Sequence, residues 1–169
     1  MSERVIAYTD GGCVPNPGPG GWGVILLFRE SARFLSGYAS ESTNNKMELT
    51  AATSALKALT KDGVDLELHT DSMYVKDGMQ KWIHNWRARN WKTADKKPVK
   101  NREYWEELDR LTLKHHVDWN WVKGHDVSRY NNFVDWLATD AIDNRKGRDQ
   151  KGPIDKIERF IDQALKSKI

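Results

Sequence analysis

Four acidic residues of this 169-residue sequence stand where side chains from distant segments could meet. Asp10 and Asp71 each follow a run typical of a buried strand, and Glu48 and Asp135 each lie near the start of a predicted helix. Carboxylates held a few ångströms apart suppress one another's ionisation unless a cation lies between them. Oxygen ligands without a cysteine or histidine cluster favour Mg²⁺ or Mn²⁺ over Zn²⁺. Two such ions could orient a water molecule and stabilise the leaving oxygen of a phosphodiester, as in two-metal hydrolysis.

Each acid also has an ordinary structural interpretation. Asp10 with Gly11 is a common turn signal, and Glu48 could complete the cap of its own helix. Asp71 could cap the helix that follows it, and Asp135 could interact with the dipole of its helix. Spacing alone therefore leaves the metal site open.

A mixed sheet with helices between its strands would have to position these acids. We expect strands at residues 5–9, 21–29, 33–39, 66–70 and 117–122, and helices at 45–61, 72–79, 80–89, 102–115 and, capped by Asn131 or Asn132, up to Asn144. A helical crossover after the third strand lets strand 66–70 lie parallel to strand 5–9, which brings Asp10 and Asp71 to one edge of the sheet. The predicted fold class is α/β: a five-stranded mixed sheet, made of an antiparallel hairpin plus parallel strands and flanked by helices.

The stretch GPGGWG, residues 18–23, matches the G-x-G-x-x-G fingerprint of dinucleotide-binding folds. That loop needs a helix directly after it, whose first N–H groups meet the pyrophosphate. The run Val24–Phe28 is β-branched and aromatic instead, which is typical of a strand. We therefore expect the match to be fortuitous and predict no organic cofactor.

The net charge of +3 is unevenly distributed. Residues 76–102 contain nine Lys or Arg against two Asp, a net charge of +7, which leaves −4 for the rest of the chain. Four tryptophans lie in or beside this basic segment: Trp82, Trp86, Trp91 and Trp105. A basic, aromatic segment favours a polyanionic partner such as nucleic acid. Alternatively, at least two of the tryptophans pack the segment's own helices.

At 169 residues the chain suits one main domain with an appendage. We expect the main domain at residues 1–147, with a basic protrusion at about 80–101. Residues 148–169 would form a polar linker and a C-terminal helix, with Ile154, Ile157, Ile161 and Leu165 on one side. That helix is too short to fold alone, so it should pack on the domain or on a partner.

The expected location is the cytoplasm. The single cysteine, Cys13, cannot form an internal disulfide, which fits a reducing compartment. The polar start of the chain does not read as a signal peptide, and no apolar run is long enough to span a membrane. We therefore expect no membrane partner.

Five short blocks, in this order along the chain, resemble the signature blocks of bacterial-type ribonuclease HI, in the ribonuclease H family. They are YTDGG (8–12), TNNKMELTA (43–51), TDSMYV (70–75), WVKGH (121–125) and VDWLA (134–138). Residues 82–101 also resemble that family's basic protrusion. The resemblance extends to about Asn144, most of the chain.

This resemblance implies endonucleolytic hydrolysis of the RNA strand of RNA–DNA hybrids, leaving 3′-hydroxyl and 5′-phosphate ends. By the same resemblance Asp10, Glu48, Asp71 and Asp135 bind two Mg²⁺ ions, with Mn²⁺ as a substitute, and His125 aids proton transfer or product release. Substrate contacts are expected from Asn16, Thr43, Asn44, Asn45, Trp82, Trp86, Lys96, Lys97, Lys100 and Asn131. We expect a monomer whose ribonuclease H catalytic domain is residues 1–147.

Three features depart from the family pattern. Met73 replaces a glutamine that touches substrate, the loop 126–130 lacks the usual Gly-His, and the terminal helix lies outside the family core. The altered loop leaves a second hypothesis open, a non-catalytic module that binds RNA–DNA hybrids. The GPGGWG match leaves a third, a cofactor-dependent oxidoreductase.

Overall fold

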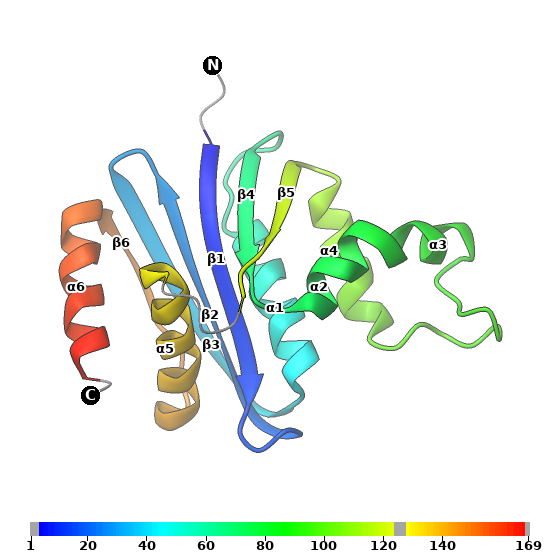
Figure 1. The fold of residues 1–169 in the computed structure, drawn as a ribbon, viewed down its shortest axis with the longest axis horizontal. Helices are drawn as coiled ribbons and strands as arrows, with labels where there is room; N and C mark the ends of the chain where they lie inside the picture. Colours follow the sequence, from blue (N-terminus) through cyan, green and yellow to red (C-terminus); the bar gives the residue numbers. More distant parts are fainter. Residues whose placement is uncertain (1–3, 124–127, 168–169) are drawn as a thin grey trace.

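The computed structural model describes residues 4–123 and 128–167. Its centre is a six-stranded mixed sheet of order β5-β4-β1-β2-β3-β6 (Figure 1). Strands β1 (Arg4–Cys13), β4 (Asp65–Thr70) and β5 (His116–Trp121) run parallel to one another. Strands β2 (Gly18–Phe28) and β3 (Ser31–Ser42) form the antiparallel hairpin beside β1. The predicted parallel pairing of the first and fourth strands is confirmed.

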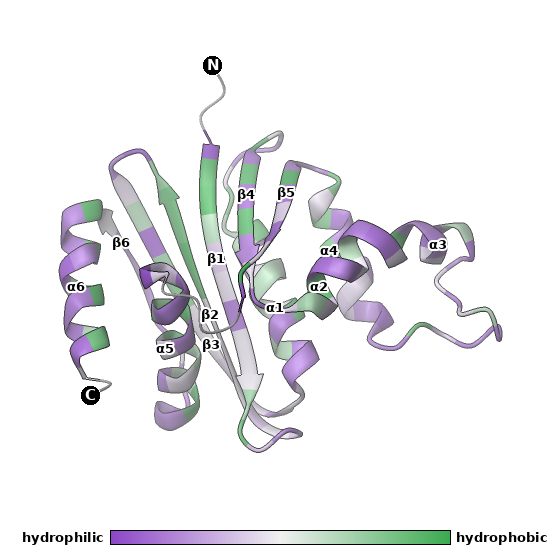
Figure 2. Cartoon of the chain, viewed as in Figure 1, coloured by the Kyte–Doolittle hydropathy of each residue, from purple (hydrophilic) through white to green (hydrophobic). Residues whose placement is uncertain are grey.

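Helices cover both faces of the sheet, because alternate residues of the strands point to opposite sides. On one face, α1 (Asn44–Lys57) and α4 (Arg102–Thr112) bury a core with Ala7, Leu66 and Leu68. On the other face, α5 (Arg129–Asn144) and α6 (Ile154–Lys166) bury a second core around Phe34 and Phe133. Hydrophobic positions recur along α6 between hydrophilic ones (Figure 2), so this amphipathic helix packs on its own chain.

The sheet has one strand more than the five predicted, and it lies where the polar linker at the start of residues 148–169 was expected. Residues Asp149–Pro153 form a sixth strand, β6, which pairs antiparallel with β3 from Leu35↔Asp149 to Ser31↔Pro153. A polar strand at a sheet edge needs only main-chain hydrogen bonds, which leave no hydrophobic period in the sequence. Bonds between Ser36 and Arg148 fix the start of this pairing: Ser36 N donates to the Arg148 carbonyl at 2.9 Å, and Arg148 N donates to Ser36 Oγ at 2.8 Å.

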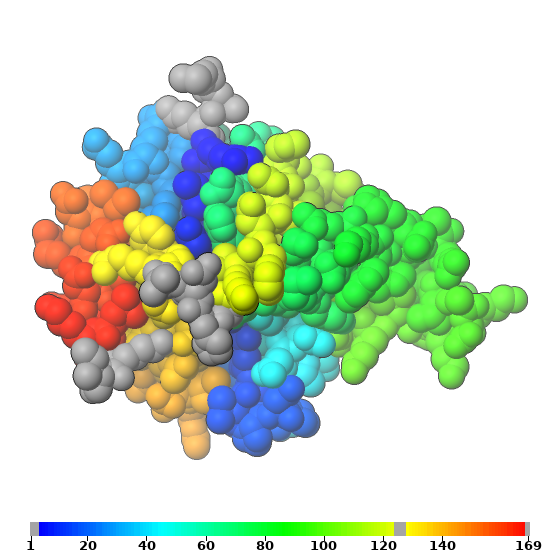
Figure 3. Space-filling view, in the orientation of Figure 1, coloured from blue at the N-terminus to red at the C-terminus, as the bar shows by residue number. Residues whose placement is uncertain are grey.

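The segment between β4 and α4 projects from the body as a protrusion, the green lobe in Figure 3. It contains α2 (Met73–Asp77), a π-helical turn η1 (Gly78–Trp82), α3 (Ile83–Ala88) and the loop 89–101. Gly78 lies against the Trp105 ring, where a side chain would collide with it. Trp105 is fully buried, and its Nε1 donates to the Tyr74 hydroxyl at 3.1 Å. The helices expected at 72–79 and 80–89 therefore form one continuous helical segment, with the π-helical turn η1 in its middle.

Within the described ranges, no helix combines the length and the apolar composition that crossing a membrane requires.

Candidate active site

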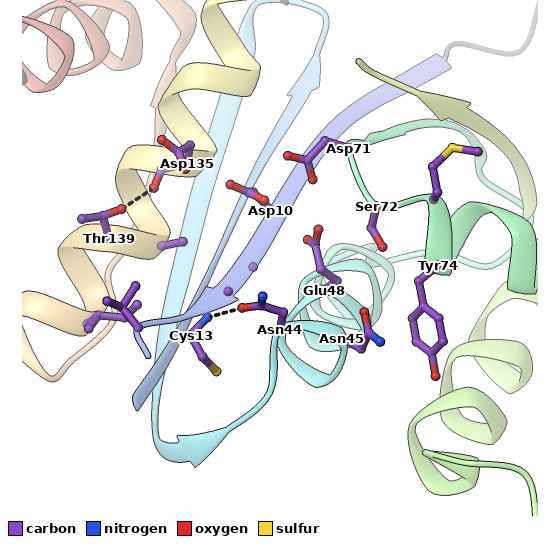
Figure 4. A pocket seen from close by; sticks show the side chains of 16 residues that line it. Asp10, Cys13, Asn44, Asn45, Glu48, Asp71, Ser72, Tyr74, Asp135 and Thr139 are labelled. Carbon is purple, nitrogen blue, oxygen red and sulfur yellow. Dashed lines mark hydrogen bonds between the residues drawn. The ribbon is translucent and has the colours of Figure 1, made fainter. Parts of the chain in front are cut away.

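Parallel pairing of β1 and β4 brings Asp10 and Asp71 to the same edge of the sheet. The paired residues Thr9 and Thr70 directly precede them. Asp10 lies within β1, opposite Gly23 of β2, and Asp71 begins the turn after β4. Their carboxylates point toward one another in Figure 4.

Helix α1 carries the third carboxylate, and a glycine sets its position. A Cβ on Gly11 would collide with the main chain of Met47, so α1 lies directly on the backbone of β1. The next residue, Glu48, therefore lies over the end of the strand. Thr43 begins this helix, because its Oγ1 accepts a hydrogen bond from Lys46 N at 3.2 Å.

Helix α5 brings the fourth carboxylate from the other face of the sheet. At Gly23, an added Cβ would lie 2.6 Å from Leu137 Cβ and 2.7 Å from the Val134 carbonyl oxygen. The helix therefore packs directly against the backbone of the strand. Asp135 lies close enough to Asp10 to add to the effect of burial, which raises the pKa of Asp10. Gly21 and Gly23 belong to GPGGWG, which lies in β2 between β1 and β3 with no helix after it. The expectation that the run Val24–Phe28 after this stretch is strand and not the first turn of a helix is confirmed, and the strand begins earlier than the predicted residue 21.

Asp10, Glu48 and Asp71 form a group with the geometry of a metal site. One carboxylate oxygen from each lies within 4.8 Å of the others. Burial first, then Asp71 and Asp135, raise the pKa of Asp10 well above its ordinary value, and burial first, then Asp10 and Asp71, does the same for Glu48. Glu48 Oε1 is buried without a hydrogen-bond partner among the described residues. A hard divalent cation would satisfy this oxygen and relieve the repulsion, so the donor set fits Mg²⁺ or Mn²⁺.

A cleft of about 470 Å³ opens over the carboxylates. Its walls include all four acids and Asn44, Asn45, Ser72, Met73, Tyr74 and Thr139 (Figure 4). Sequence reasoning did not single out Ser72, Tyr74 or Thr139. The sequence could have indicated Ser72 and Tyr74 because they follow Asp71 closely, and Thr139 because it lies one helical turn after Asp135. Met73 is 44% exposed in this wall, so its side chain is free to meet a ligand.

Two of the predicted substrate residues also hold the cleft's rim together. Asn44 Oδ1 accepts from Cys13 N at 2.7 Å, and Asn16 Oδ1 accepts from Asn44 N at 3.0 Å. Each side-chain amide still has its N–H₂ group for a ligand. Asn131 is buried in α5, and Ser128 caps that helix by accepting from Asn131 N at 3.4 Å, so the prediction that Asn131 or Asn132 is the cap is wrong. His125 lies outside the described residues.

The predicted substrate residues of the protrusion, Trp82, Trp86, Lys96, Lys97 and Lys100, do not line the cleft. Trp82 is 37% exposed, whereas Trp86 contacts the rings of Trp82, Trp91 and Trp105. The interpretation that at least two of these tryptophans pack the segment's own helices is confirmed. Four of the nine cations in residues 76–102 are in ion pairs: Lys76 and Lys81 with Asp77, Arg87 with Asp109, and Arg102 with Glu106. Lys96, Lys97 and Lys100 are exposed and form no ion pair in the described part of the chain.

The sheet order and the acidic cleft define an α/β protein with a cluster of carboxylates that could hold a divalent cation, as in metal-dependent hydrolases. Residues 2–143 match the family model described as RNase H, and the chain belongs to the ribonuclease H family.

Sequence relatives agree with this assignment. Ribonuclease H of Mesorhizobium japonicum is 56% identical over 142 residues, covering 84% of this chain and 80% of the relative. Ribonuclease HI of Caulobacter vibrioides is 50% identical over 142 residues, covering 84% and 95%.

Among solved structures, LC9-RNase H1, described as a type 1 RNase H with the type 2 active-site motif, superposes with a TM-score of 0.82 at 27% identity. That match covers 92% of this chain and 81% of the other. RNase H1 of the halophilic archaeon Halobacterium salinarum gives a TM-score of 0.59 at 26% identity, covering 83% and 98%.

Proposed function

We propose that this protein is an endoribonuclease that hydrolyses the RNA strand of RNA–DNA hybrids by a two-metal mechanism, leaving 3′-hydroxyl and 5′-phosphate ends. The observation that carries the proposal is the group of three carboxylates within 4.8 Å at the floor of the cleft, in a member of the ribonuclease H family. Relatives about half identical over most of the chain bear the name ribonuclease H or HI. An acidic, buried group has no evident structural purpose without a cation.

Asp10, Glu48 and Asp71 would hold Mg²⁺, or Mn²⁺ in its place, and Asp135 would complete the site from α5. Divalent ions bound there would orient the attacking water and stabilise the charge that develops on the leaving oxygen. The chain's own contribution is a rigid frame. Gly11 and Gly23 let two helices approach the sheet closely, so that the four carboxyl groups are held in place for the ions.

Polar groups on the rim suit a sugar–phosphate backbone. Thr43, Asn44 and Asn45 lie at the start of α1. Asn16 lies in the connection between β1 and β2 and accepts a hydrogen bond from Asn44 N, in the wall of the cleft. A hybrid displays its 2′-hydroxyls in a wide, shallow minor groove, where short donors and acceptors can reach them. Further along the duplex, Lys96, Lys97 and Lys100 would contact phosphates, and the exposed face of Trp82 would pack on a sugar or base. The ring of Trp86 would hold that of Trp82 in place by packing against it, and Asn131 would contact the substrate near the start of α5.

The remaining assignments belong to the same proposal. His125 would assist proton transfer or product release. The catalytic domain would be residues 1–147, acting as a cytoplasmic monomer without an organic cofactor. Residues 148–169 would extend its sheet and cover its second core.

Cleavage assays test the proposal directly. Wild-type protein with Mg²⁺ should cut an RNA–DNA hybrid and leave RNA and DNA duplexes intact, and EDTA should stop the reaction. Asp10→Asn should lose about 100-fold or more in rate, because it removes a cation ligand, while binding of hybrid persists. Asp143→Asn makes the same charge change at an exposed position of α5 and should retain full activity. Full activity of Asp10→Asn would remove Asp10 from the site, and hybrid binding without cleavage by wild type would favour a non-catalytic module.

A further inference from the structure

Trp121 makes an unusual contact with the main chain of a catalytic acid. It is the last residue of β5, its side chain is 42% exposed, and its indole Nε1 donates to the carbonyl oxygen of Asp71 at 3.2 Å. The residue is more than half buried, and the hydrogen bond from Nε1 fixes the direction in which its indole N–H points. None of the assignments above gives Trp121 a role.

The main-chain ladder between β4 and β5 ends just before Asp71. The last paired residues are Thr70 and Trp121, and Val122 N donates to the Thr70 carbonyl at 2.8 Å. The chain then turns into α2, with Ser72 N bonded to Thr70 Oγ1 at 3.0 Å. The carbonyl of Asp71 therefore lies one residue past the ladder, and a side chain takes the place of the next ladder bond.

A tether at this point has a physical purpose. One oxygen of Asp71 lies within 4.8 Å of an oxygen of both Asp10 and Glu48. Like charges at this distance repel. Of the three acids, Asp71 can move away most easily, because it lies in a turn and not in a strand or helix. A bond to the carbonyl resists this motion without occupying either carboxylate oxygen, so both oxygens remain available to a cation.

We propose that Trp121 is a positioning residue, whose indole N–H holds the main chain of Asp71 so that its carboxylate stays within the metal-binding group. This inference rests on the proposed metal site. Trp121 touches neither substrate nor cation in this role, and it acts only through Asp71.

Magnesium titration of the free protein tests the inference. Trp121→Phe keeps an aromatic ring but removes the donor, and its Kd for Mg²⁺, measured by calorimetry, should rise roughly 2- to 10-fold, as the loss of one hydrogen bond predicts. Trp121→His should recover part of the affinity, because the five-membered ring of histidine places Nε2 where tryptophan has Nε1. The Tm in EDTA should hardly change, since without a cation the freed Asp71 can relax away from its neighbours. Cleavage of hybrid should fall at low Mg²⁺ and recover at saturating Mg²⁺.

Gln80→Met is the matched control. Gln80 Nε2 donates to the Trp119 carbonyl at 3.2 Å, so this change removes a side-chain bond to the main chain of the same strand, away from Asp71. Its Mg²⁺ affinity should equal that of wild type. An unchanged Kd in Trp121→Phe would overturn the positioning role, as would weaker hybrid binding in EDTA with unchanged Mg²⁺ affinity, which would make the ring a substrate contact. Failure of wild type to bind Mg²⁺ would remove the metal site and the inference together.

Discussion

Asp10 and Glu48 lie where ionisation of a carboxyl group costs more free energy than it does in water. Burial and the neighbouring carboxylates raise the pKa of both, so protons are bound more tightly in the folded chain than in the unfolded chain. Such a group makes folding less favourable as pH rises from the unfolded pKa through the raised folded pKa, and the full penalty is present above that value. A bound cation removes the penalty, so metal binding and stability are linked.

The stability of Asp10→Asn without metal should show this penalty. In EDTA at pH 7.5 the variant should be more stable than wild type by about 1–3 kcal/mol, the range for relieving a poorly compensated buried polar group. Each kcal/mol corresponds to about 2–4 °C in Tm for a chain of this size. The difference should shrink as the pH falls toward the unfolded pKa near 4.

Thermal unfolding from pH 4 to 8 measures this effect. Added Mg²⁺ should raise the Tm of wild type more than that of the variant, and Asp143→Asn, changed at an exposed site, should follow wild type throughout. A variant less stable than wild type in EDTA at pH 7.5 would show that Asp10 is well satisfied without a cation.

At the scale of elements, two glycines in the strands decide where the helices that carry Glu48 and Asp135 lie. Gly11 lets α1 touch β1, and Gly23 lets α5 touch β2 directly opposite Asp10. The extension supports the same helix from outside. Glu158 of α6 accepts from Arg129 Nε at 2.8 Å and from the Tyr130 hydroxyl at 2.6 Å, and burial together with Glu158 raises the pKa of Tyr130 to about 12.

Gly23→Ala tests the contact between strand and helix. The new methyl group would meet the main chain at Val134, so α5 must move outward or the strand must shift. Overpacking of this kind destabilises by about 1–3 kcal/mol, and the displacement carries Asp135 away from Asp10, so the cleavage rate should fall as well. Urea unfolding and hybrid cleavage measure the two effects.

Gly152→Ala is the comparison, because a Cβ at Gly152 would lie 3.6 Å from Lys156 Cδ, an ordinary contact. It should leave both stability and activity close to wild type. Wild-type stability and rate in Gly23→Ala would mean that the helix position does not depend on a bare strand.

At the scale of the whole molecule, charge is segregated between the body and the protrusion. Internal ion pairs engage four of the nine cations in residues 76–102, so the free positive charge lies in the loop of the protrusion, away from the cleft. This arrangement lets one duplex contact the acidic centre and the basic loop at separate points. Phosphate contacts at the loop would offset the repulsion between the acidic cleft and the backbone.

Salt dependence of hybrid binding measures the loop's part. Replacing Lys96, Lys97 and Lys100 by Ala should lower the slope of log K against log salt by about 2–3, since each phosphate contact contributes about 0.9. Binding can be measured in EDTA, where no cleavage occurs.

An equal change of charge on the opposite side is the control. Replacing Lys151, Lys156 and Lys166 of β6 and α6 by Ala should leave the slope nearly unchanged, because these side chains lie on the extension. Equal slopes for the two triple variants would mean that only total charge matters and that the protrusion has no specific contact.

Local patterns were sufficient to predict the elements that carry the acids. Alternation in the segment 66–70 and helical spacing in 45–61 follow from the periods of the backbone, although α1 ends earlier, at Lys57. The helical crossover before strand 66–70 allows its parallel pairing with the first strand, which joins Asp10 with Asp71. The family blocks added the roles of these residues. Polar β6 and the capping by Ser128 were missed, because neither pairing at a sheet edge nor a single capping residue leaves a period in the sequence.

What the amino-acid sequence determines by itself is the set of charged groups and the strands and helices that bear them, because both depend on neighbours close along the chain. Tertiary structure alone decided that Arg87 is neutralised by Asp109, which tryptophans are buried, and that an indole N–H from β5 meets the carbonyl of Asp71. The Arg87–Asp109 and Trp121–Asp71 contacts join residues 22 and 50 positions apart. They depend on how faces pack in three dimensions, and the spacing of residues along one strand or helix carries no record of that packing.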